Sequence, residues 1–526
     1  MTDKDVFYIT TPIYYPNDVP HIGHAYTTVA CDVVARYQRL VRGADRVFFL
    51  TGTDEHGKKV PQTARDHGLD PQTFVDQMEP KWREVWQRLD VSFDDYIRTT
   101  EPRHEAAVTK LLQAVYDNGR DDIYLGTYEG LYCVSCEAYY TEDELVDGKC
   151  PIHGRPVERM SEENYFFRLS AYQDRLLEHY EQHPEAIEPE VRRNEILSLI
   201  RGGLRDFSIS RTSFAWGVPL PWDPKHVCYV WFDALTNYIT AAGFADDPER
   251  FARTWPADVH MIGKDIVRFH AVYWPAMLMA GGVEPPRKVF AHGYLLVAGE
   301  KMSKTKLTGI HPFFLADQIG VDAYRYHFLA DIQFGQDGSF SLESMLARYN
   351  ADLANGLGNL ISRVLAMLES YFEGEVPDGA DAPDEYAALQ ADAERLVETY
   401  RAALDDLQLT AAVSAATELV SQANRYLVDK APWNLAKDEG RAAELRAVLY
   451  GASETLRILA VVFWPVMPGA AGRLWEQLGV AEPLEAERLP EAARWGGLKA
   501  GTKTSRGDSL FPRLERLDPP PGAPAS

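Results

Sequence analysis

The first fifty residues contain a buried strand, a helix and a second buried strand, and this order restricts the fold more than any other feature. Val6–Thr10 is a short apolar run, the apolar residues of Tyr26–Leu40 recur at helical spacing, and Val47–Leu50 is apolar again. A strand, a helix and a strand in so short a stretch form the βαβ unit of a parallel sheet. We therefore predict an α/β fold built on a Rossmann-like parallel sheet.

More strands of this sheet are expected further along the chain. The pattern predicts buried strands at Val227–Trp231, Val259–Ile262 and Val289–His292, with a helical pattern at Ile266–Met279. Between the two groups of strands, residues 118–225 change to tyrosine-rich short strands, paired cysteines and turns. We interpret this stretch as an insertion that splits the sheet domain into the parts 1–117 and 226–292.

Strand patterns disappear after about residue 345, and five helical patterns follow. These patterns are Asn355–Leu368, Tyr386–Leu407, Thr410–Val428, Ala442–Val462 and Gly469–Leu478. We predict a connecting region at 293–345, an α-helical bundle at 346–513 and a disordered, proline-rich tail at 514–526.

Composition limits the class of protein. At 526 residues the chain is too long for one core, and about three domains are expected. No apolar run approaches the roughly 18 residues that span a bilayer, and the start of the chain leads into a strand, so we expect a cytoplasmic protein without a membrane partner. The net charge of −24 argues against a nucleic-acid partner, although a local basic groove can coexist with an acidic surface.

The motif His21-Ile22-Gly23-His24 stands where the first loop runs into a helix. Unpaired N–H groups and the helix dipole favour phosphate at such an end. Gly23 leaves room for an adenine or ribose against the backbone, while His21 and His24 can donate to phosphate oxygens. The alternative is a helix end that is merely capped by histidine.

The second motif, Lys301-Met302-Ser303-Lys304, lies in a lysine-rich loop that begins at a glycine. Two lysines with a serine between them can close on a pyrophosphate group and stabilise the transition state at the α-phosphorus by charge. The alternative is a solvated basic loop. The two motifs together favour a grip on both ends of a nucleoside triphosphate, as adenylate chemistry requires.

These motifs resemble the two signatures of class I aminoacyl-tRNA synthetases, and the surrounding segments are similar to those of the methionyl-tRNA synthetase family. The similar segments are Thr11-Pro12-Ile13-Tyr14-Tyr15-Pro16-Asn17, Thr51-Gly52-Thr53-Asp54-Glu55-His56-Gly57, Val230-Trp231-Phe232-Asp233-Ala234-Leu235-Thr236-Asn237-Tyr238 and Gly263-Lys264-Asp265-Ile266, which leads to His270. The resemblance extends to about Arg513. It departs at Thr305, where many relatives carry serine, and the hydroxyl is kept.

The resemblance implies a methionine pocket. The matching positions are Ile13, Tyr15, Trp231, Ala234, Leu235, Tyr238, Ile266 and His270, whose apolar and aromatic character suits a thioether. Asp54 matches the carboxylate that holds the substrate ammonium, and Arg211 is expected near the substrate carboxylate. Core aromatics and an N-cap aspartate are the alternatives. Because one methylene changes binding by only roughly 1–3 kcal/mol, homocysteine should also be activated, and the family removes it by cyclisation.

Three of the five cysteines form a pattern typical of a zinc site. Cys133 and Cys136 form one pair, and thirteen residues later Cys150 and His153 form another. Four such ligands bind Zn²⁺ tetrahedrally in a closed site, which predicts one structural zinc ion per chain. The lone Cys31 and Cys228 are interpreted as buried apolar residues.

The resemblance further implies that Asn359, Arg363 and Trp433 read the CAU anticodon. Asn359 and Arg363 are four residues apart and share a helix face, while Trp433 follows a proline at a helix boundary. An indole can stack on an unpaired base while polar side chains bond to base edges. A solvated polar face and a core tryptophan are the alternatives.

The implied activity is that of a methionine–tRNA ligase acting on ATP, L-methionine and tRNA(Met), including the initiator tRNA, with Mg²⁺ accompanying ATP. His21, His24, Lys301 and Lys304 would carry catalysis, and Gly23 and Ser303 would also contact ATP. Another class I synthetase, for cysteine, valine, isoleucine or leucine, is disfavoured by the short insertion and the peripheral zinc pattern. A catalytically silent tRNA-binding paralogue and a zinc-ribbon module fused to a nucleotide-binding fold are further alternatives. Because the chain ends in a proline-rich tail, we expect a monomer.

Overall fold

A computed structural model describes residues 4–134, 138–140, 142–152, 154–297, 300–301 and 310–518. The chain divides into two compact units. The first comprises residues 1–20, 48–86 and 93–293, and the second comprises residues 21–47, 87–92 and 294–526.

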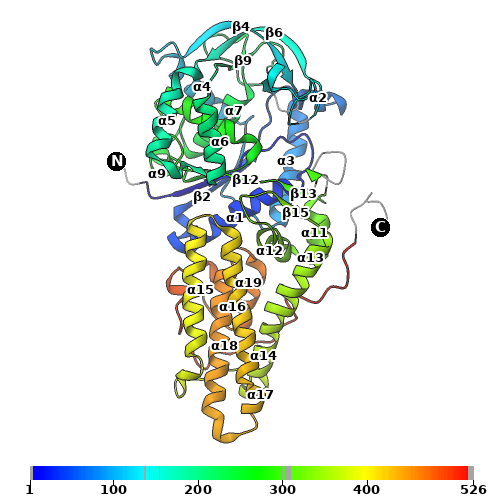
Figure 1. Cartoon of the computed structure of the whole chain (residues 1–526), viewed down its shortest axis with the longest axis vertical. Helices are drawn as coiled ribbons and strands as arrows, with labels where there is room; N and C mark the ends of the chain where they lie inside the picture. Colours follow the sequence, from blue (N-terminus) through cyan, green and yellow to red (C-terminus); the bar gives the residue numbers. More distant parts are fainter. Residues whose placement is uncertain are drawn as a thin grey trace. The chain divides into compact units, whose positions relative to one another are not determined.

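A six-stranded sheet forms the centre of the first unit (Figure 1). Its strands, in spatial order, are β3 (Asp95–Arg98), β2 (Val47–Thr53), β1 (Phe7–Thr10), β11 (Val259–Gly263), β12 (Val289–His292) and β7 (Ile187–Glu188). The pairs β2/β3, β1/β11, β11/β12 and β12/β7 are all parallel. All four residues of β1 are buried, as are those of β12, which explains their continuous apolar sequences. The predicted parallel sheet is confirmed.

Short helices accompany this sheet. They are α2 (Lys59–Asp66), α3 (Pro71–Arg88), α4 (Pro102–Tyr116), α5 (Gln173–Gln182), α6 (Glu190–Arg201), α7 (Val230–Leu235), α8 (Asn237–Ala242), α9 (Pro248–Thr254) and α10 (Trp274–Ala280). A π-helical turn, Phe269–Tyr273, leads into α10.

The stretch 118–225 contains a second sheet, of order β5-β4-β6-β8. Its strands are β4 (Ile123–Cys133), β5 (Ala138–Tyr140), β6 (Glu158–Phe167) and β8 (Phe207–Ser208), and β9 (Ser210–Arg211) pairs with β10 (Val227–Cys228) beside it. The same stretch also carries α5, α6 and β7, and β7 is the edge strand of the central sheet. These elements were not anticipated in the tyrosine-rich pattern.

One predicted strand is wrong. The pattern predicts a buried parallel strand at Val227–Trp231, but within it only Val227 and Cys228 form a strand, and they pair antiparallel with β9. Helix α7 begins at Val230. A short apolar run fits a buried strand and a buried helix equally well, and here the helix places the aromatic residues of the candidate site.

Helix α1 (Ile22–Arg42) belongs to the second unit, where a buried charge cluster fixes it. Asp32 accepts from Arg36 Nε at 2.8 Å and from Arg325 Nη2 at 2.6 Å. Arg325 also donates to the carbonyls of Pro465 and Val466, at 3.0 and 2.9 Å. These two cations hold the pKa of Asp32 below its usual range against the effect of burial.

The rest of the second unit is largely helical (Figure 1). A small sheet consists of β13 (Leu295–Val297), β14 (Glu300–Lys301) and β15 (Gly338–Phe340). Helices α11 (Pro312–Ile319) and α12 (Val321–Asp331) lie between β14 and β15 in the sequence, and α13 (Leu342–Arg348) follows β15. A π-helical stretch, Tyr349–Gly358, then joins α14 (Asn359–Phe372).

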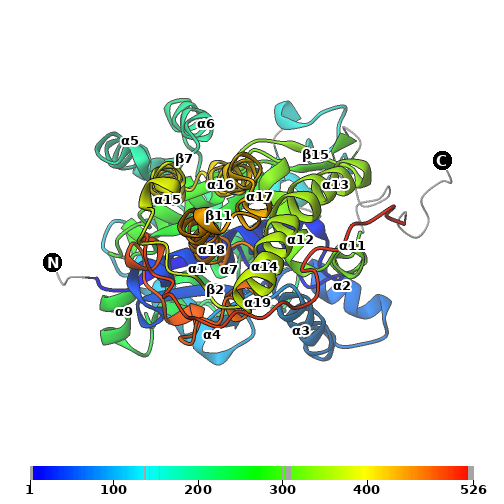
Figure 2. The same cartoon turned by 90° about the horizontal axis from the view of Figure 1, so that it is seen from below.

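The predicted helical bundle is confirmed. Its other helices are α15 (Ala387–Asp405), α16 (Leu409–Lys430), α17 (Pro432–Leu435), α18 (Ala442–Phe463) and α19 (Pro468–Gln477). Helices α15, α16 and α18 pack against one another, and Figure 2 shows them end-on. Residues 451–463 of α18 are all buried in the bundle.

Candidate active site

Three parallel strands of the first unit end beside predicted site residues. Ile13 and Tyr15 follow β1, Asp54 follows β2 directly, and Ile266 and His270 follow β11. Ligands of open α/β sheets bind beyond the carboxyl ends of the strands. The Asp54 N–H donates to the Tyr14 carbonyl at 2.9 Å, so the segments after β1 and β2 are joined at this edge.

Helices α7 and α8 carry the other predicted pocket residues. Ala234, Leu235 and Tyr238 are buried, while Trp231 is partly buried. The Trp231 indole lies flat on Phe269, with 3.7 Å between ring centroids and 4° between ring planes. Phe269 was not among the predicted site residues, although its place directly before His270 in an aromatic segment was a usable signal.

A hydrogen bond joins two predicted pocket residues, Tyr238 and His270. Nδ1 of His270 lies 3.1 Å from the Ile266 carbonyl, which can only accept, so this nitrogen carries the proton. Nε2 therefore accepts from the Tyr238 hydroxyl, at 2.7 Å. Burial lowers the pKa of His270 to about 4, and the imidazole is neutral at pH 7.

A second buried histidine stands behind Tyr238. The His260 ring lies 4.0 Å from the Tyr238 ring, centroid to centroid, and its Nδ1 is 2.8 Å from Thr10 Oγ1. Burial, with His270 and Lys4 nearby, holds the pKa of His260 well below its usual range. This wall of the candidate pocket is thus aromatic and uncharged.

Arg211 is buried beside the entrance to α7. Its guanidinium lies 4.3 Å from the ring centroid of Tyr229, the residue before α7, and 5.8 Å from that of Tyr132. Nη1 donates to Ser208 Oγ and to the Ser210 carbonyl, at 2.8 and 2.6 Å. The structure thus places a fixed cation next to the helix that carries Trp231.

His21 and His24 form a reciprocal cap on α1, in the second unit. His21 Nδ1 accepts from the Gly23 N–H at 3.1 Å, and His24 Nδ1 accepts from the His21 N–H at 3.2 Å. The two rings stack with centroids 3.7 Å apart. Since both Nδ1 atoms accept, the ring protons lie on Nε2.

Gly23 lies close to the capping ring. A Cβ at this position would lie 3.0 Å from Cε1 and 3.1 Å from Nδ1 of His21. A larger residue would therefore require the His21 ring to shift by a few tenths of an ångström. The histidine-capped helix end and the phosphate grip are compatible features of one motif.

The second motif is described only at its start. Lys301 lies in β14, opposite Leu296 of β13, while Ser303 and Lys304 lie outside the described residues.

The cysteine pattern is also described in part. Cys133 ends β4 and is buried, and Cys150 is buried at a tight turn in which its N–H donates to the Arg155 carbonyl at 2.9 Å. Cys136 and His153 lie outside the described residues. No group of three or more potential metal ligands occurs in the part of the chain that the structure describes.

The predicted anticodon residues lie together on the second unit. Asn359 is exposed at the start of α14, and Arg363 lies one turn further along the same helix. The Arg363 guanidinium lies 5.4 Å from the ring centroid of Trp433, which is 37% exposed on α17. An exposed indole beside a cation is suited to stacking with a base.

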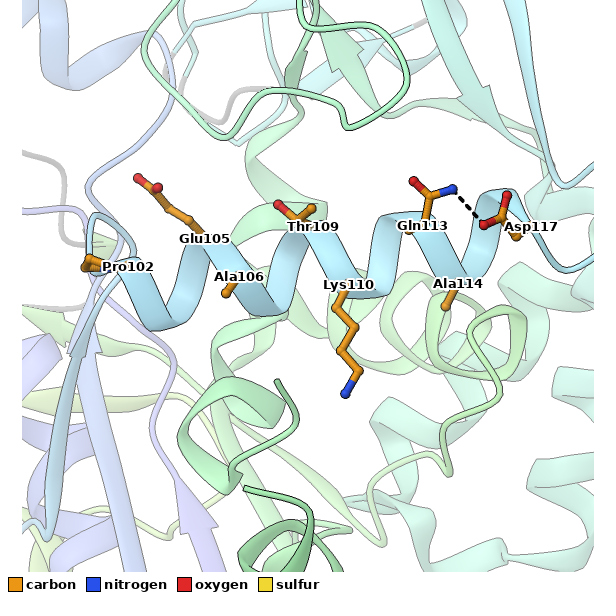
Figure 3. A pocket seen from close by; sticks show the side chains of 8 residues that line it. All are labelled: Pro102, Glu105, Ala106, Thr109, Lys110, Gln113, Ala114 and Asp117. Carbon is orange, nitrogen blue, oxygen red and sulfur yellow. Dashed lines mark hydrogen bonds between the residues drawn. The ribbon is translucent and has the colours of Figure 1, made fainter. Parts of the chain in front are cut away.

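A shallow groove of about 670 Å³ runs along one face of α4 and contains none of the predicted site residues (Figure 3). Its lining residues, which include Glu105, Lys110 and Asp117, all belong to α4 or its C-terminal end. Of its polar side chains, Lys110 donates to the Phe244 carbonyl and Gln113 donates to Asp117. The groove lacks the enclosure of a small-molecule site.

Comparison with known families matches nearly the whole chain. The model of the class I (M) tRNA synthetases matches residues 7–159 and 143–365, and that of the anticodon-binding domain of methionyl tRNA ligase matches residues 376–518.

Individual relatives agree with these matches. A methionine–tRNA ligase of Caldanaerobacter subterraneus is 50% identical over 97% of this chain and 79% of its own length. One of Streptomyces coelicolor is 50% identical over 97% of each chain. Among solved structures, Mycobacterium tuberculosis methionyl-tRNA synthetase in complex with methionyl-adenylate is 46% identical, with a TM-score of 0.90, covering 97% of this chain and 100% of that one.

Proposed function

Because the chain belongs to the methionine–tRNA ligase family of class I tRNA synthetases, we propose that it activates methionine with ATP and esterifies tRNA(Met), the initiator tRNA included. The uncharged wall formed by Tyr238 and His270 carries the assignment of the amino acid. A neutral imidazole whose two nitrogens are both engaged offers no charge to an ionic side chain. A polarizable thioether against Trp231, Leu235 and this pair is a good match.

The two ends of the substrate zwitterion have matching charges in the first unit. Asp54, buried directly after β2, would hold the ammonium group. Arg211, held by its bonds to Ser208 and Ser210, would attract the carboxylate. Ile13, Tyr15, Ala234 and Ile266 would complete the apolar part of the pocket. Lys59 Nζ lies 5.2 Å from the Tyr15 ring centroid, which adds a cation on that side.

The chemistry needs no protein nucleophile. A methionine carboxylate oxygen attacks the α-phosphorus of ATP, the bond to the β-phosphate oxygen breaks, and pyrophosphate leaves with the electron pair. The Nε2–H groups of His21 and His24, with Lys301, Ser303 and Lys304, would stabilise the charge on the phosphates, and Gly23 would let the nucleotide approach. Mg²⁺ bound with ATP supplies further charge neutralisation. In the second step a ribose hydroxyl of the tRNA 3′ end attacks the acyl carbon and AMP leaves.

Zinc is proposed as a structural ion held by Cys133, Cys136, Cys150 and His153. The burial of Cys133 and Cys150 and the tight turn at Cys150 support this role. A bound Zn²⁺ would crosslink the turn at Cys150 to the end of β4.

The second unit would recognise the anticodon. Trp433 would stack on an unpaired base, while Asn359 and Arg363 would bond to base edges. With a net charge of −24, tRNA binding should be weak and strongly salt-dependent.

We assign the catalytic role to 1–117 and 226–292, the zinc-bearing insertion to 118–225, the lysine motif to 293–345 and anticodon binding to 346–513. None of the described helices is both long and apolar enough to cross a bilayer. A cytoplasmic monomer is the proposed working state.

Charging of tRNA transcripts tests the complete reaction. We expect methionyl-tRNA to form with a CAU transcript and not with a transcript whose anticodon is replaced, and Trp433→Ala to lower charging without changing adenylate formation. Lys304→Ala should slow adenylate formation far more than it weakens methionine binding. Equal charging of both transcripts would contradict the anticodon assignment, and absence of charging would favour a silent tRNA-binding protein.

A further inference from the structure

A buried carboxylate on α7 joins two histidines from distant parts of the first unit. Asp233 is fully buried, and each of its oxygens has a different partner. Oδ2 lies 2.6 Å from His56 Nδ1, and Oδ1 lies 2.7 Å from His104 Nε2. We name His56, Asp233 and His104 the histidine clamp.

His104 bonds to both helices. Its Nε2 donates to the Asp233 carboxylate on α7, and its Nδ1 lies 3.2 Å from Thr240 Oγ1 on α8. The Thr240 hydroxyl also donates to the Thr236 carbonyl at 2.9 Å.

His56 links the clamp to the segment that follows β2. The backbone there is fixed at neighbouring positions, since the Asp54 N–H donates to Tyr14 and the Glu55 N–H donates to Thr99 Oγ1 at 2.9 Å. The edge of the His56 ring meets Trp216, whose indole N–H donates to the Glu55 carbonyl at 2.6 Å. His56 is thus a rigid extension of the segment that bears Asp54.

Helix α7 depends on such external anchors. It has only six residues and its N-cap makes no side-chain hydrogen bond, so it cannot be stable by itself. Yet Trp231, Ala234 and Leu235 flank Asp233 on this helix, and Tyr238 follows on α8. Buried ion pairs give little net stability relative to apolar packing. The function that we infer for the clamp is therefore to hold α7 in one geometry.

We propose, on the basis of the proposed function, that the histidine clamp is a positioning unit that sets the distance between the Asp54 segment and helix α7, and so fixes the methionine pocket. Asp54 on one side would hold the ammonium group, and the side chains of α7 on the other would hold the thioether. A relative shift of about 1 Å between them can cost roughly 10²-fold in rate. His56, Asp233 and His104 act through the pocket residues and do not touch the substrate.

The test uses Asp233→Asn, His104→Leu and His104→Gln in the full chain, with active sites titrated so that only folded enzyme is counted. We expect Asp233→Asn and His104→Leu to raise the KM for methionine about 10- to 100-fold in pyrophosphate exchange, and the KM for ATP less than about 2-fold. His104→Gln, whose amide can still donate to Asp233, should recover most of the loss. Thr240→Val should act in the same direction with a smaller effect.

A matched control is Asp122→Asn. Asp122 is also buried in the first unit and accepts from Tyr172 and Asn118, both at 2.6 Å, but it bonds to no predicted pocket residue. The Asp122→Asn variant should have a lower thermal midpoint, while its KM for methionine should stay within about 2-fold of the wild-type value. An unchanged KM in Asp233→Asn, or an equal rise in Asp122→Asn, would overturn the clamp.

A structural readout separates this inference from the proposed function. If the wild type shows no methionine-dependent exchange, the proposed function fails, and the clamp is still judged by crystal structures. In Asp233→Asn we expect α7 to move by about 1 Å relative to residues 54–56. An α7 that stays in place would overturn the clamp whatever the activity.

Discussion

Two buried histidine clusters are bonded to the successive helices α7 and α8, and they differ in charge, since one is neutral and the other contains an ion pair. On α8, Tyr238 donates to His270, whose pKa burial lowers to about 4, so the imidazole is neutral. On α7, burial also lowers the pKa of His56, but the Asp233 carboxylate raises it by more, and the net direction is upward. Asp233 itself would be protonated more readily by burial, yet the two histidines bring its pKa down to about 2.

The difference between the clusters comes from one carboxylate. Burial disfavours charge equally at both sites, and only a facing anion reverses the outcome. The neutral cluster suits the wall of an apolar pocket, whereas the charged cluster suits a junction between chain segments. One unit thus uses histidine for recognition and for positioning, according to its partner.

Removing the Asp233 carboxylate should leave both clusters neutral, and we expect it to have the largest effect on stability. In Asp233→Leu, His56 and His104 lose their anion, and breaking a buried pair costs about 3–5 kcal/mol. Urea unfolding should show this loss, and NMR titration should show the pKa of His56 falling below 6.5, as at His270. A His56 that still titrates above 6.5 would show that Asp233 is not the cause of the shift.

Acid should affect the neutral cluster next most strongly. The folded pKa of His270, about 4, lies below the ordinary value of 6.5, so its contribution to stability is present above pH 6.5 and is lost as pH falls toward 4. Between pH 7.5 and 4.5 this loss is about 2–3 kcal/mol. His270→Gln should lack that part of the acid sensitivity in reversible unfolding. Equal acid sensitivity in variant and wild type would contradict a neutral His270.

The neutral cluster could be located from the sequence, and the charged one could not. Tyr238 and His270 match pocket positions of the family, and the strands at 259–263 and 289–292 follow from their apolar runs. His56 and Asp233 also lie in segments that resemble the family, but the resemblance implied no role for them. Together with His104 they lie on three segments far apart in the chain, and a buried charge is recognisable only once its partners are in place. The apolar run at Val227 was ambiguous for a related reason, since tertiary packing decided where the strand ended and α7 began.

Loss of a single hydroxyl should have a smaller effect. Tyr238→Phe leaves His270 Nε2 without its donor, which should cost about 1 kcal/mol and raise the KM for methionine a few-fold. Tyr172→Phe is the matched control, because its buried hydroxyl donates to Asp122 at 2.6 Å and neither residue is a predicted pocket residue or adjoins one. It should lose similar stability with an unchanged KM. Equal changes in KM would argue against a specific role for Tyr238.

The smallest effect is expected from His56→Asn in alkali. The folded pKa of His56 is raised, so its contribution is present below pH 6.5 and is lost as pH rises through the folded pKa. The thermal midpoints of wild type and variant should therefore differ more at pH 6 than at pH 9. A difference that grows toward pH 9 would show that folding lowers the pKa of His56 instead of raising it.

The most direct measurement is amino-acid-dependent exchange of pyrophosphate into ATP, run with the twenty amino acids and homocysteine. We expect strong exchange with methionine and only background exchange with amino acids that have charged side chains. Homocysteine should give weak exchange, because one methylene is worth only roughly 1–3 kcal/mol. Exchange that is absent with methionine, or equal with leucine or isoleucine, would contradict this expectation.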